Sequence, residues 1–115
     1  MIKGVHTMFY SSDAAGLRTF LKEKLSLKPR DIGHGWLIFD LPEADMGCHP
    51  ADESHGAPSG THDISFYCEN IQETVKELKE KGVTFKGEIE DHGYGFVTQF
   101  YAPGDFWIQL YQPKY

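Results

Sequence analysis

Two histidines of this 115-residue chain each follow a glycine by two residues within similar stretches. His6 lies in "GVHTMFY" and His62 in "GTHDISFY", among the β-branched and aromatic residues that are typical of a strand. A neutral imidazole is a common ligand of divalent metal ions, and a strand histidine is also often a hydrogen-bonded residue of a core or its rim. The paired occurrence favours a shared role for the two residues.

The residues around His6 predict a strand, a helix and then short strands. Capping residues in "SSDAAG" precede an apolar stripe with the spacing of one helical face, and Pro29 ends the helix. The stripe consists of Leu17, Phe20, Leu21 and Leu25. The segments "GWLIFDLP" and "ADMGCHP" then predict a hairpin that turns at Pro42 and Glu43.

The same order returns after a polar stretch that is rich in proline and glycine. Asn70 and Glu73 have the spacing of a capping box, and a helical stripe of Ile71, Val75 and Leu78 follows. "VTFKGEI" then predicts a short strand, and "GYGFVTQFYAPGDFWIQLYQP" predicts two strands that turn at "APGD".

These elements predict two βαβββ modules, offset by 56 residues at the histidines, in one α+β domain over residues 1–115. Module 1 is expected at 1–50, a linker at 51–60 and module 2 at 61–115.

The two modules, their strand histidines and the ending "IQLYQP" resemble the vicinal oxygen chelate superfamily. That superfamily holds glyoxalase I, extradiol dioxygenases, fosfomycin-resistance enzymes and bleomycin-binding proteins. The resemblance covers nearly the whole chain. It implies that each module curls into half of a cup, so that a curved mixed sheet encloses a divalent metal ion.

The resemblance also implies a ligand set. His6 and His62 match the first-strand ligands of the two modules, and Gln109 stands where the family ending has a glutamate. A glutamine can coordinate through its amide oxygen but brings no charge. The fourth position falls near Gly47, which cannot ligate, and His49 lies two residues further on the same strand face. The expected metal is Fe, Mn, Zn or Ni, and a metal-free cup stays open as the alternative.

One feature of module 2 opposes a ligand role for its histidine. His62 shares strand parity with Ile64 and Phe66, which look like core residues.

Aromatic residues crowd the later strands of both modules, and most are expected in the core. Trp36 and Tyr94 are the candidates for an aromatic wall that binds substrate, which favours a planar or apolar ligand. The glycines of "DHGYG" either let Tyr94 swing across the cup mouth or only form a turn.

Composition excludes several classes of protein. The net charge is −6 and the lysines alternate with glutamates, which argues against a nucleic-acid partner. The sequence has no apolar run of membrane-spanning length and no signal peptide, so a cytoplasmic protein is expected. Cys48 and Cys68 lie in apparent strands and are expected to be buried free thiols.

The first hypothesis for function is a metal-dependent dioxygenase, isomerase or lyase that acts on a small oxygenated or aromatic compound. A metal-free protein that binds a small molecule such as an antibiotic or metabolite is the second. A regulatory or scaffolding partner without a ligand is the third. The apolar strand "FWIQLY" needs cover on both faces, which predicts a homodimer.

Overall fold

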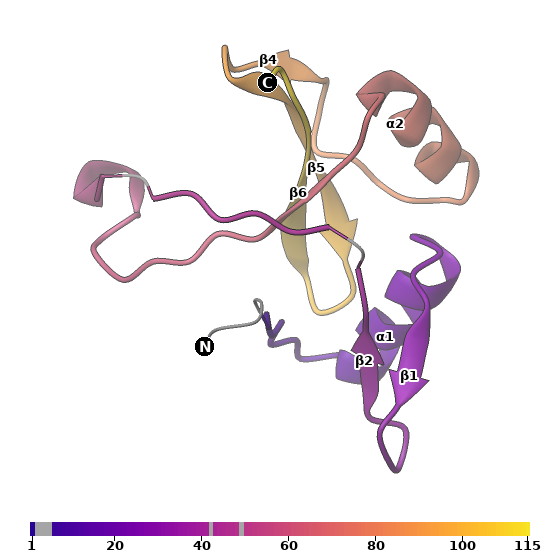
Figure 1. Ribbon diagram of the computed structural model, residues 1–115. Coiled ribbons are helices and arrows are strands. Elements are labelled where there is room, and N and C mark those ends of the chain that lie inside the picture. Colours follow the sequence, from indigo (N-terminus) through magenta and orange to yellow (C-terminus); the bar gives the residue numbers. More distant parts are fainter. Residues whose placement is uncertain (2–5, 42, 49) are drawn as a thin grey trace.

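The computed structural model describes residues 1, 6–41, 43–48 and 50–115, and it has the predicted α+β class with a mixed sheet (Figure 1). The helices are α1 (Ala14–Glu23), α2 (Ile71–Glu80) and the short 3-10 helix η1 (Glu53–His55). The strands are β1 (Pro29–Asp31), β2 (Leu37–Phe39), β3 (Ser65–Tyr67), β4 (Glu90–Asp91), β5 (Gly95–Ala102) and β6 (Phe106–Pro113). Within the described ranges, no helix is long and apolar enough to cross a membrane.

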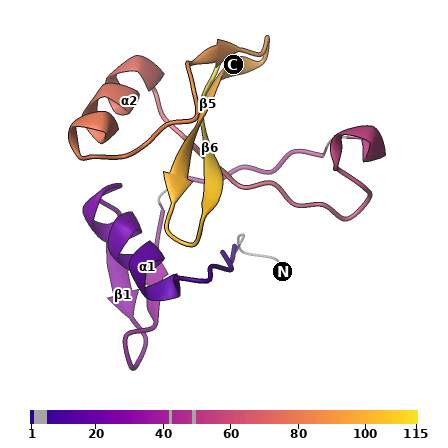
Figure 2. The ribbon, with the colours of Figure 1, turned by 180° about the vertical axis from the view of Figure 1, so that it is seen from behind.

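The second half of the chain forms a complete βαβββ unit. Its four strands lie in the order β3-β6-β5-β4, in which β3 runs parallel to β6 and the other neighbours are antiparallel. The long β5–β6 hairpin turns at residues 103–105, as "APGD" predicts, and Figure 2 shows it from behind with α2 beside it. Strand β4 begins just after the predicted "VTFKGEI", in which only Phe85 makes a bridge, to Phe100.

The main core lies between the two helices and one face of this sheet. Ile71, Val75 and Leu78 of α2 are buried, and the sheet contributes Phe100, which is 1% exposed. Leu17 and Leu21 of α1 belong to the same cluster. The other two residues of the predicted stripe, Phe20 and Leu25, are half-buried against it, with Leu25 beyond the end of the helix. The sheet residues beside Phe100 are Ala102, Ile108 and Leu110.

The first half of the chain differs from the predicted module. Residues 37–39 form strand β2, but β2 pairs with β1 instead of with "ADMGCHP". The described parts of "KGVHTMFY" and "ADMGCHP" contain no strand, and the predicted turn residue Pro42 lies outside the described residues. The last segment of module 1 contains Gly47 and Pro50, which are poor strand residues. In module 2 the first strand, β3, pairs with the last strand, β6. A first strand that lacks this neighbour has no ladder to join.

The segment before α1 nevertheless packs on the second half. The Phe9 ring lies 6.2 Å from the Phe66 ring and 6.1 Å from that of Phe106, and Ser11 Oγ donates a hydrogen bond to the Pro103 carbonyl at 2.8 Å. The radius of gyration is 15.0 Å, whereas a compact chain of this length has about 13 Å. The first half is attached at its start and through α1, and Phe39 of β2 packs at the edge of the core, whereas the turn between β1 and β2 extends away from it (Figure 1).

The repeat has a period of 57 residues in the structure. Both ends of α2 lie 57 residues after the ends of α1, and the N-caps Asp13 and Asn70 keep this spacing. Each N-cap carboxylate or amide oxygen accepts from the N–H three residues later, as the capping-box spacing predicts for Asn70. His6 and His62 are 56 residues apart, so their spacing is one residue shorter than the spacing between the two helices.

Candidate functional site

The sheet of module 2 has one face against α2 and one face turned away from it. Ile108 and Leu110 of β6 point to the α2 side, so the alternating residues point to the other side. We call that side the open face. Its residues are Ser65 and Tyr67 of β3, Val97, Gln99 and Tyr101 of β5, and Trp107, Gln109 and Tyr111 of β6.

Polar side chains occupy the middle of the open face. Gln109 of β6 pairs with Ser65 of β3 on one side and with Gln99 of β5 on the other. The Gln109 amide Nε2 donates a hydrogen bond to Ser65 Oγ at 3.0 Å. All three side chains are half-buried, and the amide oxygen of Gln109 is not part of this bond. The middle of the face therefore offers an oriented hydrogen-bond acceptor.

Aromatic rings occupy both ends of the open face. At one end the Tyr67 and Tyr111 rings lie 6.0 Å apart, and Tyr94 lies 6.4 Å from Tyr111. At the other end the Tyr101 and Trp107 rings make an edge contact at 4.9 Å. Tyr67, Tyr101 and Trp107 are each 37% to 38% exposed. An aromatic ligand can therefore reach ring surface at both ends.

Two carboxylates lie near the first of these ends. Burial raises the pKa of the Tyr67 phenol, and the negative charges of Glu43 and Asp45 raise it further. The pKa of Tyr111 is raised above its ordinary range by a hydrogen bond with Tyr115, by burial and by Asp45. The segment 43–48 thus brings negative charge from the first half of the chain to these tyrosines.

The predicted metal ligands are placed as follows. Gln109 lies on the open face, His6 and His62 are exposed and outside the strands, and His49 lies outside the described residues. Over the described ranges, no three His, Cys, Asp or Glu side chains converge as a metal site would require. The ligand roles of these four residues stay predictions.

The period of 57 residues matches His6 with Asp63, one residue beyond His62. Both His62 and Asp63 lie in the exposed segment just before β3, where strand alternation does not apply. Counting back from the two N-caps therefore adds Asp63 as a further candidate beside His62.

The two predicted aromatic substrate contacts lie in different halves of the chain. Trp36 precedes β2, and the Arg18 guanidinium of α1 lies 5.3 Å from its ring. Tyr94 lies beside the open face, with its ring 6.4 Å from that of Tyr111 and 6.1 Å from that of His92. Both residues are 51% exposed, and both substrate roles stay predictions.

The cysteines are free thiols in different surroundings. Cys68 is half-buried, its Sγ lies 3.7 Å from the Tyr111 carbonyl, and burial raises the pKa of its thiol. Cys48 is exposed, so the expectation that it is buried was wrong. The segment that carries Cys48 does not form the strand that would have covered it.

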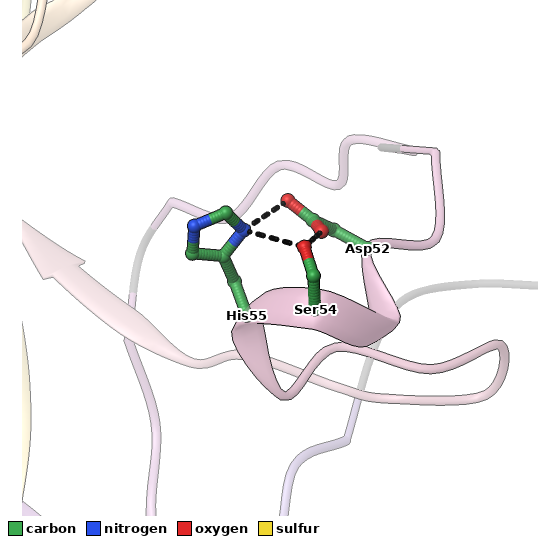
Figure 3. A network of polar contacts seen from close by, with 3 residues as sticks. All are labelled: Asp52, Ser54 and His55. Carbon is green, nitrogen blue, oxygen red and sulfur yellow. Dashed lines mark hydrogen bonds and ion pairs between the residues drawn. The ribbon is translucent and has the colours of Figure 1, made fainter.

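A polar network on η1 has the residue types of a catalytic triad but not its geometry (Figure 3). His55 Nδ1 lies 2.9 Å from Asp52 Oδ2 and 3.1 Å from Ser54 Oγ, and Ser54 Oγ donates to Asp52 Oδ1 at 2.7 Å. A triad histidine bridges its two partners with different nitrogens, whereas both contacts here use Nδ1. The His55 side chain is 80% exposed, so the network stabilises the local turn of the linker.

The fold is similar to that of several solved structures. The antibiotic-binding protein TnmS3 from Streptomyces sp. CB03234 aligns with a TM-score of 0.67 and 19% identity, over 99% of this chain and 100% of the other. Lactoylglutathione lyase from Agrobacterium tumefaciens aligns with a TM-score of 0.64 and 11% identity, over 92% and 90%. A superfamily member from Sphaerobacter thermophilus DSM 20745 aligns with a TM-score of 0.63 and 24% identity, over 96% and 98%.

No curated protein matches the sequence significantly. The family model of the Glyoxalase/Bleomycin resistance protein/Dioxygenase superfamily matches residues 3–110, which is nearly the whole chain. The repeated helices, the mixed sheet of module 2 and this match agree, and the chain belongs to the glyoxalase/bleomycin resistance protein/dioxygenase superfamily.

Proposed function

We propose that this protein binds a small planar organic molecule on the open face of its C-terminal sheet. The observation that carries the proposal is the pattern of that face, with accessible rings at both ends and the Ser65–Gln109–Gln99 row between them. Apolar walls with a few oriented polar groups are typical of small-molecule sites. The rings would stack on the ligand, and the Gln109 amide oxygen would accept a hydrogen bond from it.

The expected affinity follows from the area that the rings offer. An aromatic ligand that buries about 200 Å² of its surface gains roughly 5 kcal/mol, and lost translational and rotational freedom offsets part of it, so about 0.2 mM is the tightest Kd that the rings alone would give. The hydrogen bonds to the amide row would then decide which ligands bind more tightly. TnmS3, an antibiotic-binding protein of the same fold, supports a binding function for a chain of this architecture.

A metal-dependent dioxygenase, isomerase or lyase is the second candidate. The observation that favours it is the position of Gln109 on the open face. The family resemblance offers His6, His62 and His49 as the other ligands. Counting between the helices adds Asp63. Imidazole, carboxylate and amide oxygen are ligands that suit Fe, Mn, Zn or Ni. A bound ion would supply Lewis acidity to two neighbouring oxygens of a substrate.

Calorimetric titration with 2-naphthalenemethanol, before and after chelation, tests both candidates. The binding proposal expects a sub-millimolar Kd that chelation does not change and that Trp107→Ala weakens severalfold. Tyr10→Ala is the control because that ring is 90% exposed and lies outside the sheet. Absence of binding would overturn the proposal. Stoichiometric metal in tag-free protein, with binding lost on chelation, would favour the metal-dependent enzyme.

A further inference from the structure

We infer that the ligand carries an organic ammonium group, which sits among Tyr67, Tyr94 and Tyr111 at one end of the open face. We call these three residues the tyrosine cage. The inference rests on the proposed function, since it concerns the chemistry of the molecule that the open face would hold.

The arrangement of the rings is the first argument. Tyr111 is central, with Tyr67 at 6.0 Å and Tyr94 at 6.4 Å between ring centroids. The planes of Tyr67 and Tyr94 are inclined by 57° and 63° to that of Tyr111, so the three rings do not stack flat on one another. Clusters of aromatic rings that are inclined to one another are the usual surroundings of quaternary ammonium groups.

Electrostatics is the second argument. Glu43 and Asp45 are close enough to Tyr67 to raise the pKa of its phenol, and both carboxylates are exposed. Within the described part of the chain, neither is in a salt bridge with a lysine or arginine. The chain as a whole carries a net charge of −6. This end of the open face therefore attracts a cation and repels an anion.

The basic side chains near the two ends of the open face have other partners. Lys114 Nζ lies 2.8 Å from both carboxylate oxygens of Asp91 and 4.8 Å from the centroid of the Phe96 ring. His92 Nε2 lies 3.8 Å from Glu90 Oε2, and Lys86 lies over the Trp107 ring at the other end of the open face. Each of these three side chains contacts a group outside the tyrosine cage. We therefore expect the cation in the cage to come from a ligand.

Discrimination by charge is the expected consequence. A cation on partly desolvated rings gains up to about 2 kcal/mol, so the tyrosine cage should favour an ammonium ligand roughly tenfold or more over a neutral one with the same ring system. The preference comes from the cation–π interaction with the ring faces and not from the phenol hydroxyl groups. Tyr67→Phe should therefore keep the preference, and Tyr67→Leu should remove most of it.

Three naphthalene probes test the inference: (2-naphthylmethyl)trimethylammonium, 2-naphthalenemethanol and 2-naphthoate, titrated into the full chain at one ionic strength. We expect the ammonium probe to bind about tenfold more tightly than the alcohol and the carboxylate to bind most weakly. Tyr67→Leu should remove most of the preference, and Glu43→Gln with Asp45→Asn should reduce it. Tyr101→Leu, at the other end of the open face, should weaken all three probes alike.

The outcomes separate the inference from the proposed function. Equal affinity for the ammonium and alcohol probes would overturn the tyrosine cage and leave the binding function standing. An ammonium preference that persists in Tyr67→Leu would also overturn the cage, because the cation would then lie elsewhere. No binding of any probe would overturn both.

Discussion

Lys24 and Lys81 cap each other's helices. Lys24 Nζ donates a hydrogen bond to the Lys81 carbonyl at 2.8 Å, and Lys81 Nζ donates to the Lys24 carbonyl at 3.3 Å. Each residue is the C-cap of its own helix, and the two are 57 residues apart. The negative ends of two helix dipoles therefore meet, and each receives an ammonium group from the other repeat.

Removing either ammonium group should destabilise the protein. We expect Lys24→Met and Lys81→Met each to lower the free energy of unfolding by about 0.3–1 kcal/mol, because carbonyls at a helix end lose a cationic donor. The loss in the double variant should differ from the sum of the single losses, since both residues belong to one contact. Urea denaturation measures these values.

Lys28→Met is the matched control, because this lysine is exposed and lies outside the helices. Its substitution should leave the unfolding midpoint nearly unchanged. Strictly additive losses at Lys24 and Lys81 would show that the two residues act independently.

Module 2 could be predicted from the sequence almost completely. The apolar stripe of α2, its Asn70 cap and the turn at "APGD" are local signals, and local hydrogen bonds and burial determine those elements. Module 1 was predicted less well. Its first and last segments were expected to be strands, but a strand requires a partner that local sequence does not supply.

The candidate site was predictable only in part. The family resemblance identified the position of Gln109, and the structure places its side chain on the open face. Counting between the two helices pairs His6 with Asp63, so the pairing of His6 with His62 depends on residue type and not on the spacing of the elements. The tyrosine cage was not predicted, because Tyr67, Tyr94 and Tyr111 come from separate segments that only the folded sheet brings together.

The two cysteines should react with thiol reagents at different rates. Cys48 is exposed, whereas Cys68 is half-buried with a raised thiol pKa, so less of it is thiolate and access is restricted. We expect Cys48 to react with Ellman's reagent at least about tenfold faster at neutral pH. Cys48→Ser should remove the fast phase, and Cys68→Ser should remove the slow one. Two equal rates would contradict the burial of Cys68.

The tyrosines of the cage should ionise at higher pH in the folded protein. The pKa values of Tyr67 and Tyr111 are raised, so the neutral phenols are favoured by folding. Their contribution to stability is full below the unfolded-state pKa of about 10 and is lost as the pH rises through the folded-state values. Phenolate absorbance should therefore appear later in folded than in urea-unfolded protein, and Tyr67→Phe should remove part of the delayed signal. Coincident titrations would contradict this.

The chain should form a homodimer at micromolar concentration. β3 is an edge strand of its sheet, and the first half exposes large apolar side chains that one copy leaves uncovered. These residues include Met8, Ile32, Trp36, Leu41 and Met46. Sedimentation should give twice the chain mass of 13.1 kDa, and Ile32→Lys should shift the protein toward monomer. A wild-type species of 13.1 kDa would refute the dimer.

Ring-selective NMR of the six tyrosines and two tryptophans, recorded during titration with 2-naphthalenemethanol, tests the binding function most directly. A ligand on the open face shifts the ring signals of residues that line it, because stacked aromatic groups change each other's shielding. We expect saturable shifts at Tyr67, Tyr111 and Trp107 with one common Kd, and little change at Tyr10, which lies outside the sheet. Binding that leaves the open-face rings unshifted, or no saturable shift at any ring, would contradict the account.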